Sequence, residues 1–258
     1  MKVLFSIIVF TLALITSAQT RDYYQLKIYR MVDAEQGNEL ESYFESAYVP
    51  ALKRAGVSHV GVFKNIELEG IDNQVADGAY YVLIPMASMT DVELLDKKIS
   101  EDPKYIQSAS DYLNANHDQA PYARLEIVLL KAFEDHPNYR LPQLTAPMGE
   151  RIYELRSYES PTETYFQNKL KMFNQGDEIG LFSRLGFNAS FYGEVLAGSA
   201  MPNLMYMTSY NNRADRDDKW KQFVNDPQWK SLIGDEQYAN NVSSADLIFL
   251  RPLSFSDF

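Results

Sequence analysis

Two short segments of the chain alternate hydrophobic and polar residues in the way that β-strands do. They are residues 23–31, with the sequence YYQLKIYRM, and residues 151–159, with the sequence RIYELRSYE. Successive side chains of a strand point to opposite faces of its sheet, so this period of two predicts one more apolar and one more polar face. Both segments are therefore expected to be strands.

Each of these strands is followed by signals for a helix. The expected capping residues are Asp33 with Gln36 in the first case, and Ser160 with Pro161 and Glu163 in the second. Such side chains accept hydrogen bonds from the free N–H groups of a first helical turn. Gly56 and Gly186 are predicted to end these helices, because glycine readily adopts the left-handed conformation found there.

The same succession of elements is predicted in both halves of the chain. The further strands are residues 57–66, 79–85 and 125–131 in the first half, and 187–196, 204–210 and 246–251 in the second. A second helical stretch begins near Thr90 or Asn212, with Glu93 in capping register in the first half. The order βαββαβ predicts an α+β fold of two ferredoxin-like repeats, in which helices cover one face of each sheet.

Short sequence matches between the halves keep the same order along the chain. YQLKIY at 24–29 returns as YELRSY at 153–158, RAGV at 54–57 as RLGF at 184–187, and DPKY at 102–105 as DPQW at 226–229. Three collinear matches predict an internal duplication. The expected organisation is a signal peptide at 1–18, a diverged first repeat at 19–133, a linker with three prolines at 134–149, and a second repeat at 150–258. The two bare sheet faces would meet as an intrachain pseudo-dimeric α/β barrel.

The N-terminal residues have the pattern of a secretory signal. They read MKVLFSIIVFTLALITSAQ, with an early Lys2, an apolar stretch of about thirteen residues and then small residues. This stretch is too short to cross a bilayer, which needs roughly twenty apolar residues. The alternative to a cleaved signal is a retained membrane anchor. Small residues at Thr16 and Ala18 predict cleavage after Ala18 and a secreted or periplasmic protein without a membrane span in the mature chain.

Composition narrows the classes of function. The chain of 258 residues has 46% hydrophobic residues, a net charge of −11 and no cysteine. The apolar content predicts a folded protein, and the acidic balance argues against a nucleic-acid surface. The lack of cysteine excludes thiol catalysis, thiolate zinc sites and disulfides.

One set of motifs resembles a known family. The residues are YELRSY at 153–158, LGF at 185–187, and the spacing of Arg216, Trp220, Phe223, Asp226, Pro227 and Trp229. Together they resemble the NIPSNAP family, and the first half resembles a diverged copy without the Arg-to-Trp portion. The resemblance implies a dimeric α/β barrel, in a superfamily that includes cofactor-free monooxygenases and haem proteins. It implies no reaction, because the molecular function of the family is poorly defined.

The more polar strand faces are expected to point into a cleft between the two sheets. The candidate ligand-binding residues there are Lys27, Tyr29, Glu154, Arg156, Tyr158 and Tyr192. They either satisfy one another as an internal network, or form a pocket in which Arg156 or Lys27 pairs with an anion. The leading hypothesis is a protein that binds a small molecule or a protein partner, with a possible homo-oligomer. A cofactor-independent monooxygenase or isomerase is the alternative, and an interaction module using the exposed helix face is a third.

The remaining candidates for chemistry are few. His59, His117 and His136 are too scattered to predict a metal site, and the catalytic residues stay unknown. His59 is either a core histidine or a haem ligand, and His117 either a helix C-terminal cation or a haem ligand; we therefore predict no cofactor, with haem left open. Trp220, Phe223 and Trp229 are expected to be mostly buried core residues, because their spacing matches one helix face.

Overall fold

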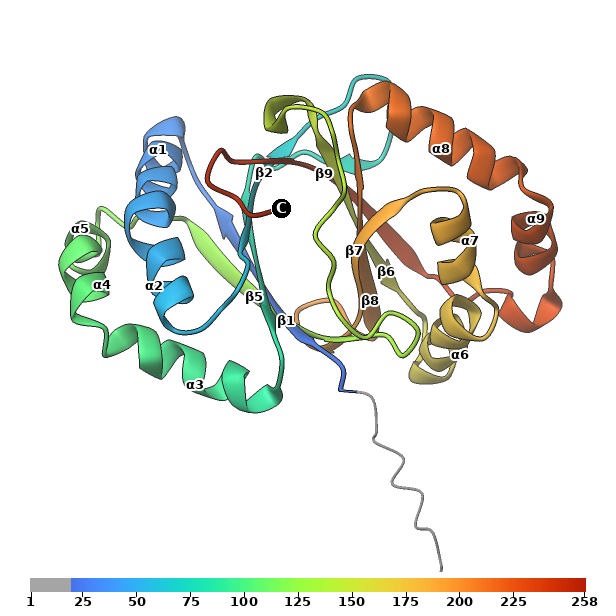
Figure 1. Ribbon diagram of the computed structural model, residues 1–258, viewed down its shortest axis with the longest axis horizontal. Coiled ribbons are helices and arrows are strands. Elements are labelled where there is room, and N and C mark those ends of the chain that lie inside the picture. The colour runs from blue at the N-terminus through green and yellow to red at the C-terminus, as the bar shows by residue number, and fades with distance from the viewer. Residues whose placement is uncertain (1–19) are drawn as a thin grey trace, which may run out of the picture.

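The computed structural model describes residues 20–258, and eight strands of this part of the chain close into an antiparallel barrel (Figure 1). The order around the barrel is β2-β4-β1-β5-β7-β8-β6-β9, and β9 pairs back with β2. A short β3 pairs in parallel with β9. The strands are β1 (Tyr23–Arg30), β2 (Gly61–Ile66), β3 (Gln74–Val75), β4 (Tyr80–Met86), β5 (Arg124–Ala132), β6 (Ile152–Glu159), β7 (Asn188–Ala197), β8 (Asn203–Tyr210) and β9 (Ser244–Pro252).

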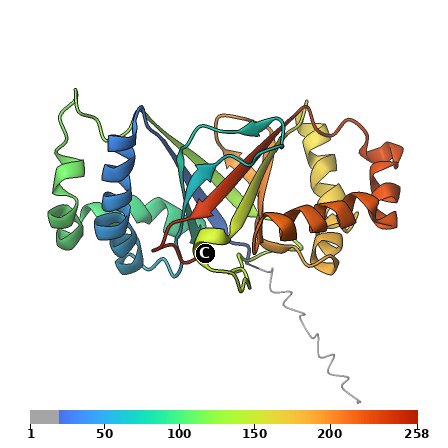
Figure 2. The same cartoon turned by 90° about the horizontal axis from the view of Figure 1, so that it is seen from above.

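Helices flank the barrel on two opposite sides (Figure 2). The first-half helices are α1 (Ala34–Tyr43), α2 (Val49–Arg54), α3 (Met89–Ser100), α4 (Pro103–Ser108) and α5 (Ser110–Leu113), with a π-helical turn at Phe44–Tyr48 between α1 and α2. The second-half helices are α6 (Glu163–Asn174), α7 (Glu178–Arg184), α8 (Arg213–Asn225) and α9 (Pro227–Ile233). The predicted order βαββαβ is therefore present in each half, apart from the additional β3. The result is a mixed α/β fold around a closed eight-stranded sheet.

Local signals placed most helix ends correctly. Asp33 caps α1 and accepts from the Gln36 N–H, and Asn212 caps α8. Gly56 and Gly186 have φ angles of 104° and 74°, as their place after a helix predicts. The start of α6 differs from the prediction, since Thr162 is its N-cap. The Ser160 hydroxyl instead donates to the Asn241 carbonyl.

The hydrophobic core has three layers, and the middle one lies inside the barrel. That interior combines residues of both halves: Tyr24 packs on Phe191, with ring centroids 4.9 Å apart, and Phe63 packs on Tyr153 at the same separation. An outer layer on each side fills the space between the sheet and its helices. The expectation that the inner sheet faces of the two halves meet is therefore met.

The prediction of which strand face points inward is wrong. Tyr24, Leu26 and Leu155 belong to the barrel interior, whereas Tyr29 belongs to the layer under the first-half helices. A small barrel is filled by side chains and offers them no route to water, so the apolar set lies inside. The polar set can be accommodated under the helices, where long side chains pass between elements toward solvent. The predicted polar cleft between the sheets is thus an apolar core.

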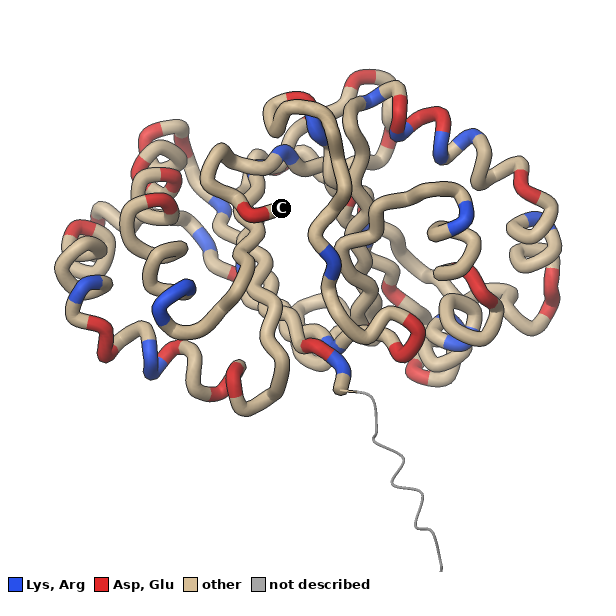
Figure 3. The backbone as a smooth tube through the Cα atoms, in the orientation of Figure 1, with Lys and Arg blue, Asp and Glu red and all other residues tan. Residues whose placement is uncertain are grey.

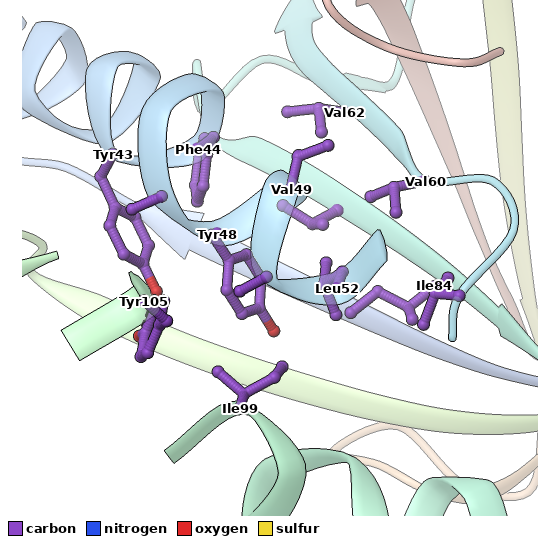
Figure 4. Packing of buried hydrophobic residues seen from close by; sticks show 14 of the residues in the cluster. Tyr43, Phe44, Tyr48, Val49, Leu52, Val60, Val62, Ile84, Ile99 and Tyr105 are labelled. Carbon is purple, nitrogen blue, oxygen red and sulfur yellow. Dashed lines mark hydrogen bonds between the residues drawn. The ribbon is translucent and has the colours of Figure 1, made fainter. Parts of the chain in front are cut away.

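The first-half outer layer is rich in tyrosine (Figure 4). Tyr43 stacks on Tyr112 with ring centroids 3.7 Å apart, and its hydroxyl lies 2.9 Å from that of Tyr105. Tyr48, from the π-helical turn, points toward α3 and lies under the Lys27 ammonium, 5.1 Å from ring centroid to Nζ. Aromatic side chains therefore fill this layer.

Acidic residues outnumber basic ones in the chain, and Figure 3 shows where both kinds lie along the described backbone. Charged residues of both signs are spread along the outer helices, and the barrel strands carry fewer of them. Within residues 20–258, no helix combines the length and the apolar character needed to cross a bilayer. The predicted signal peptide and its cleavage site after Ala18 lie outside the described residues.

Candidate functional site

A pocket of about 330 Å³ lies between the outer face of the second-half sheet and its helices. It is lined by Arg156 and Tyr158 of β6, Lys169 of α6, Glu178 and Phe182 of α7, Tyr206 of β8, Arg216, Trp220, Phe223 and Val224 of α8, and Trp229 of α9. Aromatic rings form most of its wall. Three cationic side chains and one carboxylate supply its charge, so its polar surface is net positive.

The fully buried carboxylate of Glu154 anchors the cationic side of this pocket. Arg216 donates to it twice, from Nε to Oε2 at 2.8 Å and from the second terminal nitrogen to Oε1 at 3.3 Å. The indole N–H of Trp220 also donates to Oε2, at 2.9 Å. One residue of β6 therefore fixes two residues of α8 and sets the position of this helix over the sheet.

Arg156 extends from the same strand into the pocket. Its Nε donates to Glu154 Oε1 at 2.7 Å, a terminal nitrogen lies 2.6 Å from the same oxygen, and the other donates to the Tyr158 hydroxyl at 2.9 Å. Its guanidinium lies over the Trp220 ring, 3.8 Å from the centroid. A guanidinium has five N–H groups, so these contacts leave two that have no acceptor in the described part of the chain.

A second buried ion pair lies across the pocket. Lys169 Nζ donates to Glu178 Oε2 at 3.2 Å, and both side chains are almost fully enclosed. The ammonium also lies 4.6 Å from the centroid of the Phe173 ring. Glu178 is 2% exposed. No other hydrogen bond to its carboxylate is present among residues 20–258.

The surroundings shift the pKa values of these groups. Burial raises the pKa of the Glu178 carboxyl, and the charges of Lys169 and Arg156 only partly oppose this. Burial also raises the pKa of the Tyr206 hydroxyl well above its usual value. Burial opposes the charge of Arg156, but neighbouring Tyr206, Tyr158 and Glu154 outweigh it, so its pKa lies well above the ordinary value. At neutral pH the pocket thus contains a permanent cation and neutral phenols.

The six predicted ligand-binding residues do not form one site. Glu154, Arg156 and Tyr158 form the network above, under the second-half helices rather than between the sheets. Lys27 and Tyr29 lie on the other side of the barrel, where burial lowers the pKa of Lys27 and Asp96 lies 3.8 Å from its ammonium. The prediction that all six residues line one cleft between the sheets is therefore wrong.

Tyr192 is also on the opposite face from the predicted one, and a β-bulge explains the difference. The register of β7 against β8 shifts between Ala189 and Phe191. This extra residue reverses the alternation, so Phe187 and Tyr192 both pack under the helices while Phe191 points into the barrel. Tyr192 stacks on Tyr206, with ring centroids 5.5 Å apart.

Lys169, Glu178 and Tyr206 line the pocket but were not among the residues predicted from the sequence. Their contacts join three different elements, and no local pattern relates them. Trp220 and Trp229 were predicted to be mostly buried core residues, whereas both are half-buried at the pocket. Arg216 could have been predicted as a site residue, because it belongs to the motif on which the family resemblance rests.

A larger pocket of about 690 Å³ lies between the linker, α7 and the start of β7. His136 and Tyr192 line it together with exposed linker residues. His136 is 3% exposed, and its Nε2 has no hydrogen-bond partner within residues 20–258. Burial and the charge of Arg140 lower the pKa of His136 to about 4. This imidazole is therefore neutral at physiological pH.

The histidines do not suit haem in the aromatic pocket, because none of the three lines it. His59 Nδ1 is 2.7 Å from the Tyr139 hydroxyl, and the His117 side chain is 98% exposed. The part of the chain that the structure describes contains no group of three metal-ligating side chains.

Comparison with known proteins shows to which family the half with the aromatic pocket belongs. The NIPSNAP family profile matches residues 153–257. This part of the chain is a NIPSNAP domain. The domain spans β6 to β9 and so includes Glu154, Arg156, Glu178 and Arg216. No curated protein matches the sequence.

Solved structures resemble the whole chain in fold. A "putative monooxygenase" of Fusobacterium nucleatum has a TM-score of 0.59 at 8% identity, over 92% of this chain and 94% of that one. One of the same designation from Lactobacillus acidophilus has a TM-score of 0.53 at 10% identity, over 90% and 94%. An anthrone oxidase-like protein has a TM-score of 0.52 at 10% identity, over 90% and 92%. At these identities the likeness concerns the fold alone.

Proposed function

We propose that the NIPSNAP domain binds a compact aromatic small molecule whose oxygen atom carries negative charge or can develop it. The observation that carries this proposal is the position of Arg156, which lies over Trp220 in the pocket and keeps two N–H donors unused. A ligand oxygen can accept from these donors while its ring packs between the aromatic walls.

The charge balance supports an electron-rich ligand. Arg156, Arg216 and Lys169 line the pocket, whereas Glu178 is its one lining carboxylate. Glu154 lies behind the two arginines and Asp217 pairs with Arg216 at 3.0 Å, so the carboxylates that compensate the arginines stand outside the pocket lining. A volume of about 330 Å³ accommodates a two-ring compound.

Tryptophan fluorescence tests the proposal directly, because the chain has two tryptophans and both line the pocket. The probe is 2-tetralone, a bicyclic ketone, and its comparison compound is tetralin, which has the same rings without the oxygen. We expect 2-tetralone to change the fluorescence saturably and tetralin to bind at least about tenfold more weakly, the equivalent of one hydrogen bond to a charged group.

The matched variants are Arg156→Lys and Arg184→Lys. The first keeps a positive charge beside Glu154 but removes the forked donor, so we expect the preference for 2-tetralone to disappear. Arg184 pairs with Asp226 on the surface and should leave binding unchanged. Absence of saturable binding, or an unchanged preference in Arg156→Lys, would refute the proposed function.

An oxygen-dependent enzyme is the second candidate. It is supported by the fold shared with proteins designated as monooxygenases and an anthrone oxidase-like protein, and by Arg156, which can stabilise an oxyanion. Anthrone is the probe, since it reacts with one O₂ to give anthraquinone and one water. Oxygen uptake above the buffer rate, lost in Arg156→Lys, would favour this candidate. Ligand binding without oxygen uptake would contradict this candidate and favour a binding protein.

We also propose that the barrel is an intrachain pseudo-dimer that arose by duplication. The strand order supports it, because β5-β1-β4-β2 in one half corresponds to β9-β6-β8-β7 in the other. The junctions β5–β7 and β2–β9 are equivalent under exchange of the halves. An experimental structure in which residues 23–131 and 151–251 do not superpose would contradict it.

Export is a separate proposal that is supported by the N-terminal sequence. Cleavage after Ala18 would leave Gln19 as the first residue. Intact mass of the protein from its own cells tests it, and a mass that includes Met1–Ala18 would contradict it.

A further inference from the structure

Glu178 has the surroundings of a proton acceptor rather than of a structural carboxylate. It lies at the first position of α7, is 2% exposed and lines the aromatic pocket. Only Oε2 accepts a hydrogen bond, from Lys169, among the described residues. Glu154, by contrast, uses both oxygens for Arg156, Arg216 and Trp220. The one carboxylate that lines the pocket therefore has an unused oxygen, whereas both oxygens of Glu154, which lies behind the arginines, are occupied.

Arg156 supplies a cationic hydrogen-bond donor in the same pocket in which Glu178 supplies a carboxylate. Both line it, and the charge of Arg156 is close enough to lower the pKa of Glu178. A base and an oxyanion stabiliser in one pocket are what the removal of a proton beside a carbonyl group requires. The aromatic walls would hold the planar substrate between these two groups.

We propose that Glu178 is the general base for enolisation of an aromatic or fused-ring ketone bound in this pocket, an activity that rests on the proposed function. Glu178 takes a proton from the carbon next to the carbonyl group. The C–H electron pair forms the C–C double bond, and the carbonyl π pair moves to oxygen. Arg156 donates hydrogen bonds to that oxygen. Return of the proton to the same carbon restores the ketone, and its return to a conjugated position gives an isomer, so no oxidant or reductant is needed.

The groups around Glu178 favour this role. They are Lys169 of α6, Arg156 of β6, Tyr192 of β7 and Tyr206 of β8. Lys169 holds one oxygen in place, and burial makes the carboxylate a stronger base than an exposed one by raising its pKa. The tyrosines are neutral and do not compete for the proton, because burial raises their pKa values.

Deuterium exchange of 2-tetralone in D₂O buffer, followed by proton NMR, measures the proposed step. We expect exchange at the carbons beside the carbonyl above the buffer rate. Glu178→Gln should lower the enzyme-dependent rate by about 100-fold or more, the usual contribution of a general base. The tryptophan fluorescence change on binding should persist. Glu163→Gln, at an exposed position on α6, is the matched control and should exchange as the unchanged protein does.

The pH profile separates a base from a merely structural carboxylate. The exchange rate should rise with pH through an apparent pKa above the ordinary glutamate range, and Glu178→Gln should lose this limb. If the single variant does not fold, the double variant Lys169→Met with Glu178→Gln removes both charges and should bind without exchange.

The outcomes distinguish the two proposals. Binding of 2-tetralone without exchange above the buffer rate would overturn the role of Glu178 and leave the proposed function. The same applies if Glu178→Gln exchanges as fast as the unchanged protein. Absence of binding would overturn the proposed function itself.

Discussion

At the scale of single residues, the buried carboxylate of Glu154 determines the arrangement of the NIPSNAP domain. It accepts hydrogen bonds from Arg156, which lies on the same strand, and from Arg216 and Trp220 of α8. These two helix residues follow Glu154 by more than 60 positions in the sequence. Desolvating these charges is costly, and their mutual hydrogen bonds offset that cost. The network therefore has a structural role, and the unused donors of Arg156 give it a second role at the pocket.

Arg156→Met should destabilise the protein by about 3 kcal/mol, because Glu154 loses one of its two cationic partners while remaining buried. Urea denaturation measures this change. Arg184→Met is the control, since this guanidinium is half exposed and its loss should change stability much less. Equal effects of the two substitutions would show that the Glu154 network contributes little to stability.

His136 should make stability depend on pH. Its pKa falls from 6.5 to about 4 on folding, so the unfolded chain binds more protons between these values. Its contribution is complete above pH 6.5 and decreases as the pH falls, by on the order of 3 kcal/mol at pH 4. His136→Phe should remove this part of the decrease, as unfolding measurements at several pH values would reveal.

The control for this prediction is His117→Gln, because the His117 side chain is 98% exposed. This substitution should leave the pH dependence as it is. An unchanged slope in His136→Phe would mean that the imidazole titrates alike in the folded and unfolded chain.

At the scale of elements, helix ends and one β-bulge decide what reaches the pocket. Asn212 caps α8, which carries Arg216 and Trp220 over the sheet. The bulge in β7 turns Tyr192 toward α7 and Phe191 into the barrel. The cap could be predicted from sequence because it depends on neighbouring residues. The bulge could not, because it arises from pairing with a strand that follows later in the chain.

Gly186→Ala should cost about 1 kcal/mol through the backbone alone. Gly186 ends α7 at a φ of 74°, and a Cβ there would meet no atom closer than 3.8 Å. Thermal unfolding measures the loss. Gly149→Ala is the control, since Gly149 has neither a positive φ nor a neighbouring atom. A stabilising effect at Gly186 would contradict the left-handed conformation.

At the scale of the whole molecule, the two halves complete one barrel. Strands of both halves pair at β5–β7 and β2–β9, and side chains of both fill the interior. Neither half can bury its inner sheet face without the other. The halves should therefore unfold together.

Two probes of urea unfolding test this cooperativity. Tryptophan fluorescence reports on the second half alone, because both tryptophans lie in α8 and α9, whereas far-UV circular dichroism reports on both halves. We expect coincident transitions. A dichroism change that precedes or follows the fluorescence change would show that the halves are independent folding units.

The sequence by itself determined the elements, their order and the family resemblance, because alternation, caps and repeated motifs depend on residues close together in the chain. Glycines at 56 and 186 marked helix ends correctly. Only the tertiary structure decided which strand face turned inward. A period of two gives two faces but does not say which is covered by helices and which by the opposite sheet. The pocket depended on that choice, since Arg156, Glu178 and Trp220 meet only when β6, α7 and α8 pack together.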